Sequence, residues 1–263
     1  WREMSRLIPI VLLCLSSTSS LAGDSSFALD TQRLRQGALF GAQVISGQLG
    51  LRTGTAESDI ELTALPALVV GGDLWPSEAM GLFGRVSIGS GAKIADVLGH
   101  EIDYNLAQSR FGVRYRWFSG PASDALAGGL GFGGRLFYQF VQEQRPAVMI
   151  DRMIIGPEAH TFITIPINSS LWIRTTAHIG LPFFVREQPA DTGDPKGFYN
   201  FGAGVMGVVH IGGPWSLQMD VEYDYRFINF KGIGTRAAGI TRGKTQDAFG
   251  SATLGVRYIP FDD

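Results

Sequence analysis

The sequence lacks the features of several common protein classes. Its only cysteine, Cys14, lies near the amino terminus, so residues 23–263 cannot form a disulfide or a cysteine-based metal site. No apolar run approaches about 18 residues, which excludes helices that span a membrane. Charged residues make up only 17% of the chain, against about 25% in a typical soluble domain. No basic stripe with interleaved aromatic residues is present, so nucleic-acid binding is not expected.

The amino terminus has the pattern of a secretory signal peptide. A basic start precedes a short apolar stretch at 7–15, and Ser20-Leu21-Ala22 provides small residues on either side of a larger one before a cleavage site. The apolar stretch is shorter than the roughly 20 residues of a membrane-spanning helix. We therefore expect a signal peptide at 1–22, a short periplasmic leader at 23–36 and one β-barrel domain at 37–263.

The segment 215–227 alternates in polarity at every residue. Its odd positions are all apolar or aromatic, whereas its even positions include Asp220, Glu222 and Asp224. Successive side chains of a β-strand point to opposite faces, so this strand has one apolar and one polar face. Together with an export signal, the pattern predicts a barrel whose apolar face contacts lipid and whose polar face lines the interior.

Ten segments have strand-like character, and each exceeds the ~9–11 residues that a tilted strand needs to cross the hydrocarbon layer. We predict strands at about residues 38–52, 59–74, 79–90, 101–118, 129–142, 153–167, 170–186, 198–211, 215–229 and 247–261. The predicted fold class is all-β, a transmembrane antiparallel up-and-down β-barrel of about ten strands. Connections alternate in length, which is typical of short periplasmic turns and longer outer loops.

Two early segments have an imperfect alternation. In 38–52 the apolar positions begin at Phe40, Ala42 and Val44 and then change parity. In 101–118 the apolar positions of the first half are out of phase with those of the second. A bulge near Ala107–Ser109 would reconcile the two halves, because one extra residue exchanges the faces. Alternatively, the first half of this segment stands outside the membrane.

Tryptophan positions give a further indication of topology. The four that follow the signal, Trp75, Trp117, Trp172 and Trp215, each lie beside a connection expected on the periplasmic side. Indole rings favour the membrane–water interface. With Tyr258, these residues are predicted to form an aromatic girdle on that side, although parity places Trp172 inward, where it would close the floor of the interior.

With these features the chain resembles the bacterial outer-membrane β-barrel proteins. The resemblance rests on the signal, the ten alternating strands and the last strand, Phe249–Phe261. It implies the outer membrane of a Gram-negative bacterium, contact with outer-membrane lipid and lipopolysaccharide, and insertion by the barrel assembly machinery. That machinery usually reads a terminal aromatic residue, whereas here Phe261 is followed by two aspartates.

Strand parity places many ionisable side chains on the inward face. The predicted interior network comprises Arg85, Arg110, Arg114, Arg116, Arg135, Glu158, His160, Arg174, His178, Asp220, Glu222, Asp224, Arg226 and Arg257. Bases dominate the third to fifth strands and acids the ninth. The fourth and ninth of ten strands lie opposite each other, so we expect Arg–carboxylate pairs across the interior. An ion-pair plug and a narrow pore with charged walls both remain possible.

His160 and His178 fall on adjacent predicted strands, close to Glu158. Such a group could bind a metal or act as a general base. No third ligand is evident, which favours histidines that bond to their neighbours. No nucleophile, phosphate-loop or zinc-helix motif is present, so we predict no enzymatic activity, no metal and no cofactor.

The last outer connection, 230–246, carries four basic residues and no acid. These are Lys231, Arg236, Arg242 and Lys244. They could contact lipopolysaccharide phosphates or belong to a solvated loop.

The sequence as a whole favours an integral outer-membrane barrel, either structural or a narrow passive pore for ions and small solutes. A surface barrel that binds or adheres through its outer loops is the first alternative. An outer-membrane enzyme that processes lipid or peptide is the second.

Overall fold

The computed structural model describes residues 37–53, 56–95, 101–120, 125–142, 150–168, 170–181, 183–188, 191–235 and 242–259. The predicted signal peptide and leader lie outside these residues, as do Cys14, Arg236 and Phe261.

All regular elements of the described residues are β-strands. They are β1 (Gly37–Thr53), β2 (Ala56–Leu74), β3 (Met80–Ala95), β4 (Glu101–Phe118), β5 (Ala127–Gln142), β6 (Asp151–Pro166), β7 (Leu171–Gly180), β8 (Phe184–Gln188), β9 (Asp194–Gly212), β10 (Trp215–Lys231) and β11 (Arg242–Tyr258). Within these residues no helix has the length and apolar character needed to cross a membrane.

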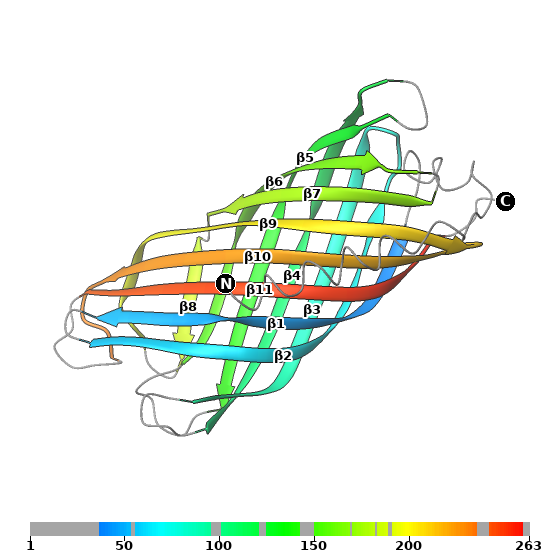
Figure 1. Cartoon of the computed structure of the whole chain (residues 1–263). Coiled ribbons are helices and arrows are strands. Elements are labelled where there is room, and N and C mark those ends of the chain that lie inside the picture. Colours follow the sequence, from blue (N-terminus) through cyan, green and yellow to red (C-terminus); the bar gives the residue numbers. More distant parts are fainter. Residues whose placement is uncertain are drawn as a thin grey trace.

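The strands form one antiparallel sheet that closes into a barrel (Figure 1). Neighbours in the chain pair from β1 to β6, and β1 also pairs with β11. The pair Ala38↔Tyr258 joins the first and last strands, so the barrel chain begins and finishes at the same end. We call this the terminal end, and the opposite end, where Thr53 pairs with Ala56, the distal end. The predicted antiparallel barrel is confirmed.

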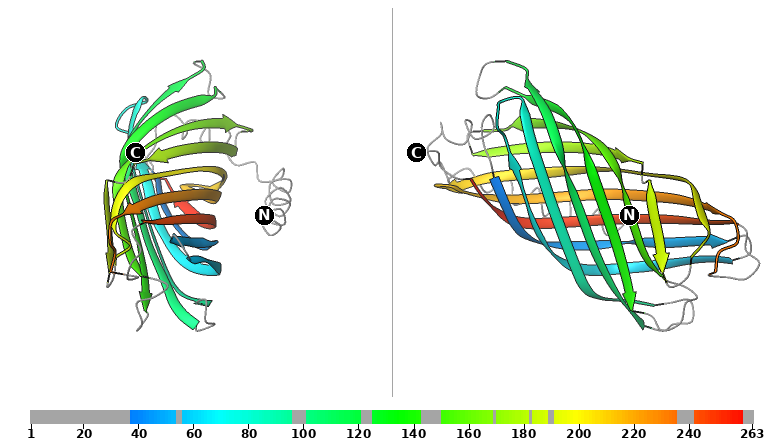
Figure 2. Two further views of the ribbon diagram at one scale, coloured as in Figure 1. Left: turned by 90° about the vertical axis from the view of Figure 1, so that its left-hand side faces the viewer. Right: turned by 180° about the vertical axis from the view of Figure 1, so that it is seen from behind.

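One wall position differs from the prediction. The single strand expected at 170–186 is two strands, β7 and β8, and both pair with β6. β7 pairs with the second half of β6 and β8 with the first half, so together they occupy one of ten wall positions. β7 also pairs with β9, whereas β8 pairs with β6 alone. In both turned views the strands wrap around a single interior (Figure 2).

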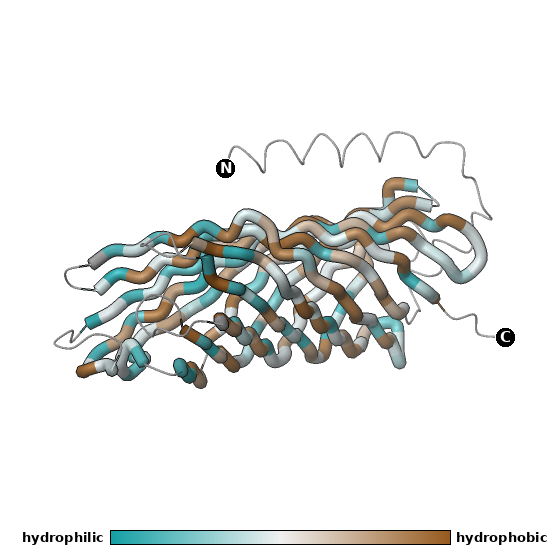
Figure 3. The backbone as a smooth tube through the Cα atoms, turned by 90° about the horizontal axis from the view of Figure 1, so that it is seen from below, coloured by the Kyte–Doolittle hydropathy of each residue, from teal (hydrophilic) through white to brown (hydrophobic). Residues whose placement is uncertain are grey.

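In the terminal half of the barrel, large apolar side chains point outward. This surface, which we call the apolar belt, includes Phe40, Val44, Leu68, Val70, Leu82, Val86, Phe111, Val113, Leu130, Phe132, Ile163, Ile179, Phe201, Val205, Leu254 and Val256, all of them exposed. The alternation of polar and apolar residues along the strands is visible in Figure 3. Every strand from β1 to β11 except β8 and β10 contributes to this set.

In the distal half the two faces exchange their chemistry. Apolar side chains now point inward and form a buried cluster, which we call the distal core: Ile45, Leu49, Ile60, Leu62, Leu65, Ala67, Ala92, Ile94, Ile102, Tyr104, Leu106, Phe137, Val141, Ile154, Ile228, Phe230 and Phe249. On β1 to β3 the outward side chains there are polar and exposed, as in Arg52, Glu57, Glu61 and Lys93. Elsewhere in this half the outward face still carries aromatic residues, such as Phe140 on β5 and Tyr199 on β9. The barrel therefore has an apolar exterior in the terminal half and a mixed exterior, polar on β1 to β3, in the distal half.

The exchange explains the imperfect alternation in β1 and β4. In β4 the pairing with β3 and with β5 runs through Ala107–Ser109 without a shift, so the bulge predicted there is wrong. The apolar residues of its first half simply point into the distal core. Register shifts occur instead where β2 faces β1 and where β3 passes from Gly89 to Ala92.

The strands are also longer than predicted at the distal end. β6 begins at Asp151, β9 at Asp194 and β11 at Arg242, all inside segments that we expected to be loops. The predicted strands are too short there because the outward residues at these ends are charged, and charged segments without apolar alternation are assigned to loops.

The aromatic girdle is only partly outward. Trp117, Trp215 and Tyr258 are exposed at the terminal end, and the rings of Trp215 and Tyr258 lie 4.9 Å apart. Trp75 is 5% exposed, so its predicted place in an outward girdle is wrong. Its ring lies inside the barrel, 3.8 Å from the guanidinium carbon of Arg116.

The two faces of β5 provide a test of the distal core. Phe137 is 1% exposed within the core, whereas Phe132 on the same strand is 61% exposed in the belt. We expect Phe137→Ala to lower the free energy of unfolding by about 3–5 kcal/mol, because it leaves a cavity among close-packed side chains. Phe132→Ala, the matched control, is expected to cost much less. Heat-modifiable gel migration in detergent would measure both, and equal losses would contradict the inverted packing.

Candidate functional site: the charged interior

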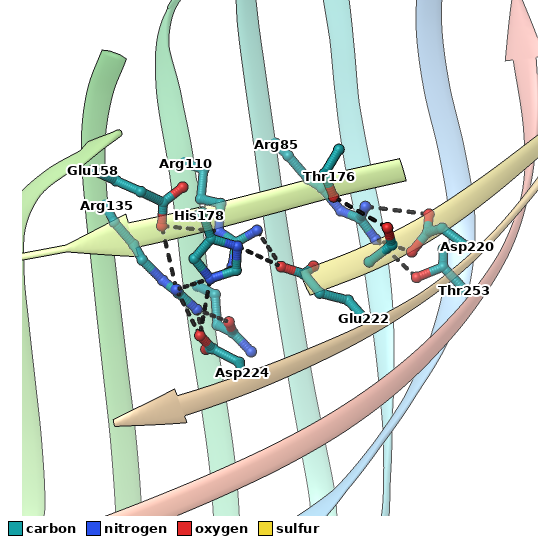
Figure 4. Close-up of polar contacts among 12 residues, drawn as sticks. Arg85, Arg110, Arg135, Glu158, Thr176, His178, Asp220, Glu222, Asp224 and Thr253 are labelled. Atoms are coloured by element: carbon teal, nitrogen blue, oxygen red, sulfur yellow. Dashed lines mark hydrogen bonds and ion pairs between the residues drawn. The ribbon is translucent and has the colours of Figure 1, made fainter. Parts of the chain in front are cut away.

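The interior of the terminal half is lined by charged side chains from most of the wall strands. They point inward because the alternate residues of the same strands occupy the outward apolar belt. The structure places every member of the predicted network on the inner side. Three arginines from neighbouring strands, Arg85 on β3, Arg110 on β4 and Arg135 on β5, face three acids on β10 (Figure 4).

Each of these arginines has its own carboxylate across the barrel. Both terminal nitrogens of Arg85 donate to Asp220, at 3.2 Å each. Arg110 forms an ion pair with Glu222. Arg135 donates to Asp224 through both terminal nitrogens, and to Glu158 at 3.3 Å. Because β3 to β5 and β10 lie on opposite walls, these contacts tie the two sides of the barrel together.

Asp224 is the most shared acid of the interior. Besides Arg135, it accepts a hydrogen bond from Arg226, and its Oδ1 lies 3.1 Å from His178 Nε2. The guanidinium carbon of Arg226 lies 3.5 Å from the centre of the Phe137 ring and 4.8 Å from that of Phe249. Arg226 therefore joins the ion-pair network to the distal core.

Strand parity missed an acid near the terminal end. Asp73 on β2 bonds to Arg114 at 2.6 Å and to Arg257 at 3.2 Å. The sequence alone could have placed Asp73 on the inward face, because the apolar residues Leu68, Val70 and Leu74 of the same strand have even numbers and Asp73 an odd one. In the structure these three apolar side chains are exposed.

A second missed group lies near the distal end. Arg152 bonds to Glu187 at 2.9 Å and to Asp247 at 3.1 Å, and the side chains of all three are at most 5% exposed. The expected loops covered Arg152 and Glu187, so no parity could be assigned to them.

His160 and His178 are directly paired between β6 and β7. Arg114 Nε donates to His160 Nε2 at 3.0 Å. Glycines make room for both rings, since a side chain at Gly131 would collide with His160 and one at Gly202 with His178. Among the described residues no group of three or more histidine, cysteine and acidic side chains could hold a metal ion.

The interior is closely filled. One cavity of about 130 Å³ lies among the charged side chains of the terminal half. Two smaller cavities measure about 40 Å³ and about 20 Å³. The smallest is lined in part by Phe137, Ile154 and Ile228 of the distal core.

No protein-family model and no curated protein matches the chain. Among solved structures it is similar to the outer membrane protein OprG from Pseudomonas aeruginosa, with 9% identity, coverage of 88% of this chain and 98% of that one, and a TM-score of 0.43. It is also similar to the transport unit of the autotransporter AIDA-I from Escherichia coli, with 13% identity, 93% and 95% coverage, and a TM-score of 0.43. These relatives are bacterial outer-membrane barrels. At such identities and TM-scores, the likeness carries no statement about function.

The Arg135–Asp224 pair is suited to a double-mutant cycle, since both side chains are 7% exposed. We expect Arg135→Met or Asp224→Leu alone to cost about 3–5 kcal/mol of unfolding free energy, because each takes a partner away from a buried charge. The double variant should cost clearly less than the sum of the two single losses, although Glu158 and Arg226 then each lack one partner. Additive losses would contradict the coupling.

The control for this cycle is the ion pair Arg52–Glu57, which is also short, at 2.6 Å, but whose side chains are 49% and 58% exposed. Its cycle in the same assay should give a coupling close to zero, because water screens an exposed pair.

Proposed function

We propose that the protein is an integral outer-membrane β-barrel with a sealed interior, a structural barrel rather than an open pore. The observation that carries the proposal is the exchange of faces along long strands such as β1 and β4. The apolar belt offers a surface for lipid, while the distal core fills the interior beyond it. Export by the predicted signal peptide is consistent with that location.

The dimensions of the barrel agree with this placement. β1 has 17 residues, which at about 3.3 Å per residue and a tilt of about 40° rise about 43 Å along the barrel axis. An outer-membrane apolar band is about 25 Å tall. The terminal half thus lies in the membrane, with its short connections in the periplasm, and the distal half projects beyond the lipid into water.

The interior supports the sealed form in two ways. In the membrane half, ion pairs from opposite walls cross the space that a pore would need. In the projecting half, Tyr104, Phe137 and Phe230 are among the largest fully buried side chains. Water does not fill an apolar core of this packing, so ions have no hydrated path to the distal end.

Planar-bilayer recording tests this proposal. We expect the inserted parent protein to show no steady current steps, with flotation of proteoliposomes as the control for insertion. A variant with Tyr104→Ser, Phe137→Ser and Phe230→Ser should conduct more than the parent if the distal core is the seal. Steady ohmic steps from the parent would contradict the sealed form and favour the narrow pore.

The distal rim offers a surface for lipopolysaccharide. Lys231 pairs in register with Arg242, and Lys244 lies opposite Arg52, so strands β1, β10 and β11 bring these cations together. All of them are exposed. We include lipopolysaccharide phosphates among the proposed partners of this rim, because clustered cations bind phosphate by charge-assisted hydrogen bonds.

Neutralisation of the rim tests that contact. We expect replacement of Lys231, Arg236, Arg242 and Lys244 by glutamine to lower the amount of lipopolysaccharide that copurifies with the barrel. Replacement of the exposed Lys93, which pairs with Asp103 on a different part of the wall, is the control and should leave it unchanged. If the parent, the four-residue variant and the Lys93 variant copurify with equal amounts of lipopolysaccharide, the rim does not bind it.

A further inference from the structure

We propose that the charged interior cavity of the terminal half binds a small oxyanion of the phosphate or carboxylate class. The cavity, about 130 Å³ in volume, lies between opposite walls of the terminal half. Five arginines and four acids line it: Arg85, Arg110, Arg114, Arg174, Arg257, Asp73, Glu158, Asp220 and Glu222. The inference does not depend on whether the barrel is sealed or conducts.

The charges around the cavity are unevenly distributed. On the side toward the distal core, Arg85 is matched by Asp220, and Arg110 lies between Glu222 and Glu158. On the side toward the terminal end, three arginines surround one acid. Asp73 lies between Arg114 and Arg257, at 2.6 Å and 3.2 Å.

Arg174 has no acid of its own. Its Nε donates to Thr164 Oγ1 at 2.9 Å, and its guanidinium carbon lies 5.0 Å from the Phe162 ring centre and 5.1 Å from that of Trp172. Among the described residues no carboxylate oxygen lies within ion-pair distance of Arg174. His160, which accepts from Arg114, contributes no negative charge. Three guanidinium groups therefore lie on this side of the cavity, and the one carboxylate there pairs with only two of them.

Such an excess of positive charge is costly where water is scarce. Arg174 is 9% exposed and Arg257 8% exposed, and a buried ion is destabilised by the loss of its solvation unless a counter-ion replaces the water. An anion between the guanidinium groups would offset that loss. The Nε of Arg257 is also buried without a hydrogen-bond partner, so this arginine is not saturated by Asp73.

The geometry defines the class of ligand. Planar guanidinium groups bind carboxylate and phosphate oxygens through parallel hydrogen bonds. The cavity has room for several water molecules, which suits an ion of that size and no larger one. Glu158, Asp220 and Glu222 on the facing side would repel an anion with charge spread over many groups. A single small oxyanion at the Arg114, Arg174 and Arg257 side fits all three conditions.

Titration calorimetry on the full, folded barrel in detergent and chloride buffer tests the proposal, with inorganic phosphate in one series and acetate in another. We expect one-to-one binding of at least one of them. Binding of phosphate alone assigns the phosphate class, and binding of acetate alone assigns the carboxylate class. If neither binds, the proposal is overturned.

Variants identify the site. We expect Arg174→Gln to weaken the binding about tenfold, through the loss of a hydrogen-bonded charge, and Lys93→Gln on the outer surface, away from the rim, to leave it unchanged. Asp73→Asn should instead tighten it, because it removes the acid that competes for Arg114 and Arg257. A purely structural role for Asp73 would not produce tighter binding. Heat-modifiable migration confirms folding of each variant, and unchanged affinity in both Arg174→Gln and Asp73→Asn would overturn the assignment.

Discussion

The structure depends on one set of contacts, in which guanidinium groups of one wall meet carboxylates of the opposite wall. Arg85, Arg110 and Arg135 come from three adjacent strands, and their acids come from β10 alone. A side chain that reaches across the barrel fixes the distance between walls as well as its own position. The small residues near these contacts follow from the same requirement, as at Gly131 and Gly202, where the histidine rings occupy the space of a side chain.

The same network explains why the barrel has two kinds of interior. Where the exterior is apolar, the inward face is left with the polar residues, and these are stable inside only as pairs. Where the exterior is polar, the inward face can be apolar and close-packed like a soluble core. Arg226 lies at the boundary between the two interiors. It forms an ion pair with Asp224, and its guanidinium group lies over the ring of Phe137.

Much of the fold was accessible from the sequence, because period-two alternation depends only on local residue order. That alternation gave the wall strands and placed Arg110 and Glu222 on the inward face. It could not distinguish a bulge from an exchange of environments in β4, since both reverse the apolar parity and only the pairing register separates them. Alternation also missed Arg152 and Glu187. Charged residues occupy both faces of the strands at these two positions, so no polar and apolar alternation marks them as strand. Asp73 was within reach of parity, but its two arginine partners required knowledge of which strands meet.

The exchange of faces also strengthens the register of every long strand. A slip by one residue moves each side chain to the opposite face. In a barrel whose outward face is apolar along the whole strand, such a slip causes one kind of error, since it turns polar residues outward and apolar residues inward. Here it would place Gln43 on the outward apolar belt in the terminal half and, on the same strand, Ile45 and Leu49 on the outside of the distal half. Because both errors occur together in β1, its sequence specifies the pairing of this strand from both ends.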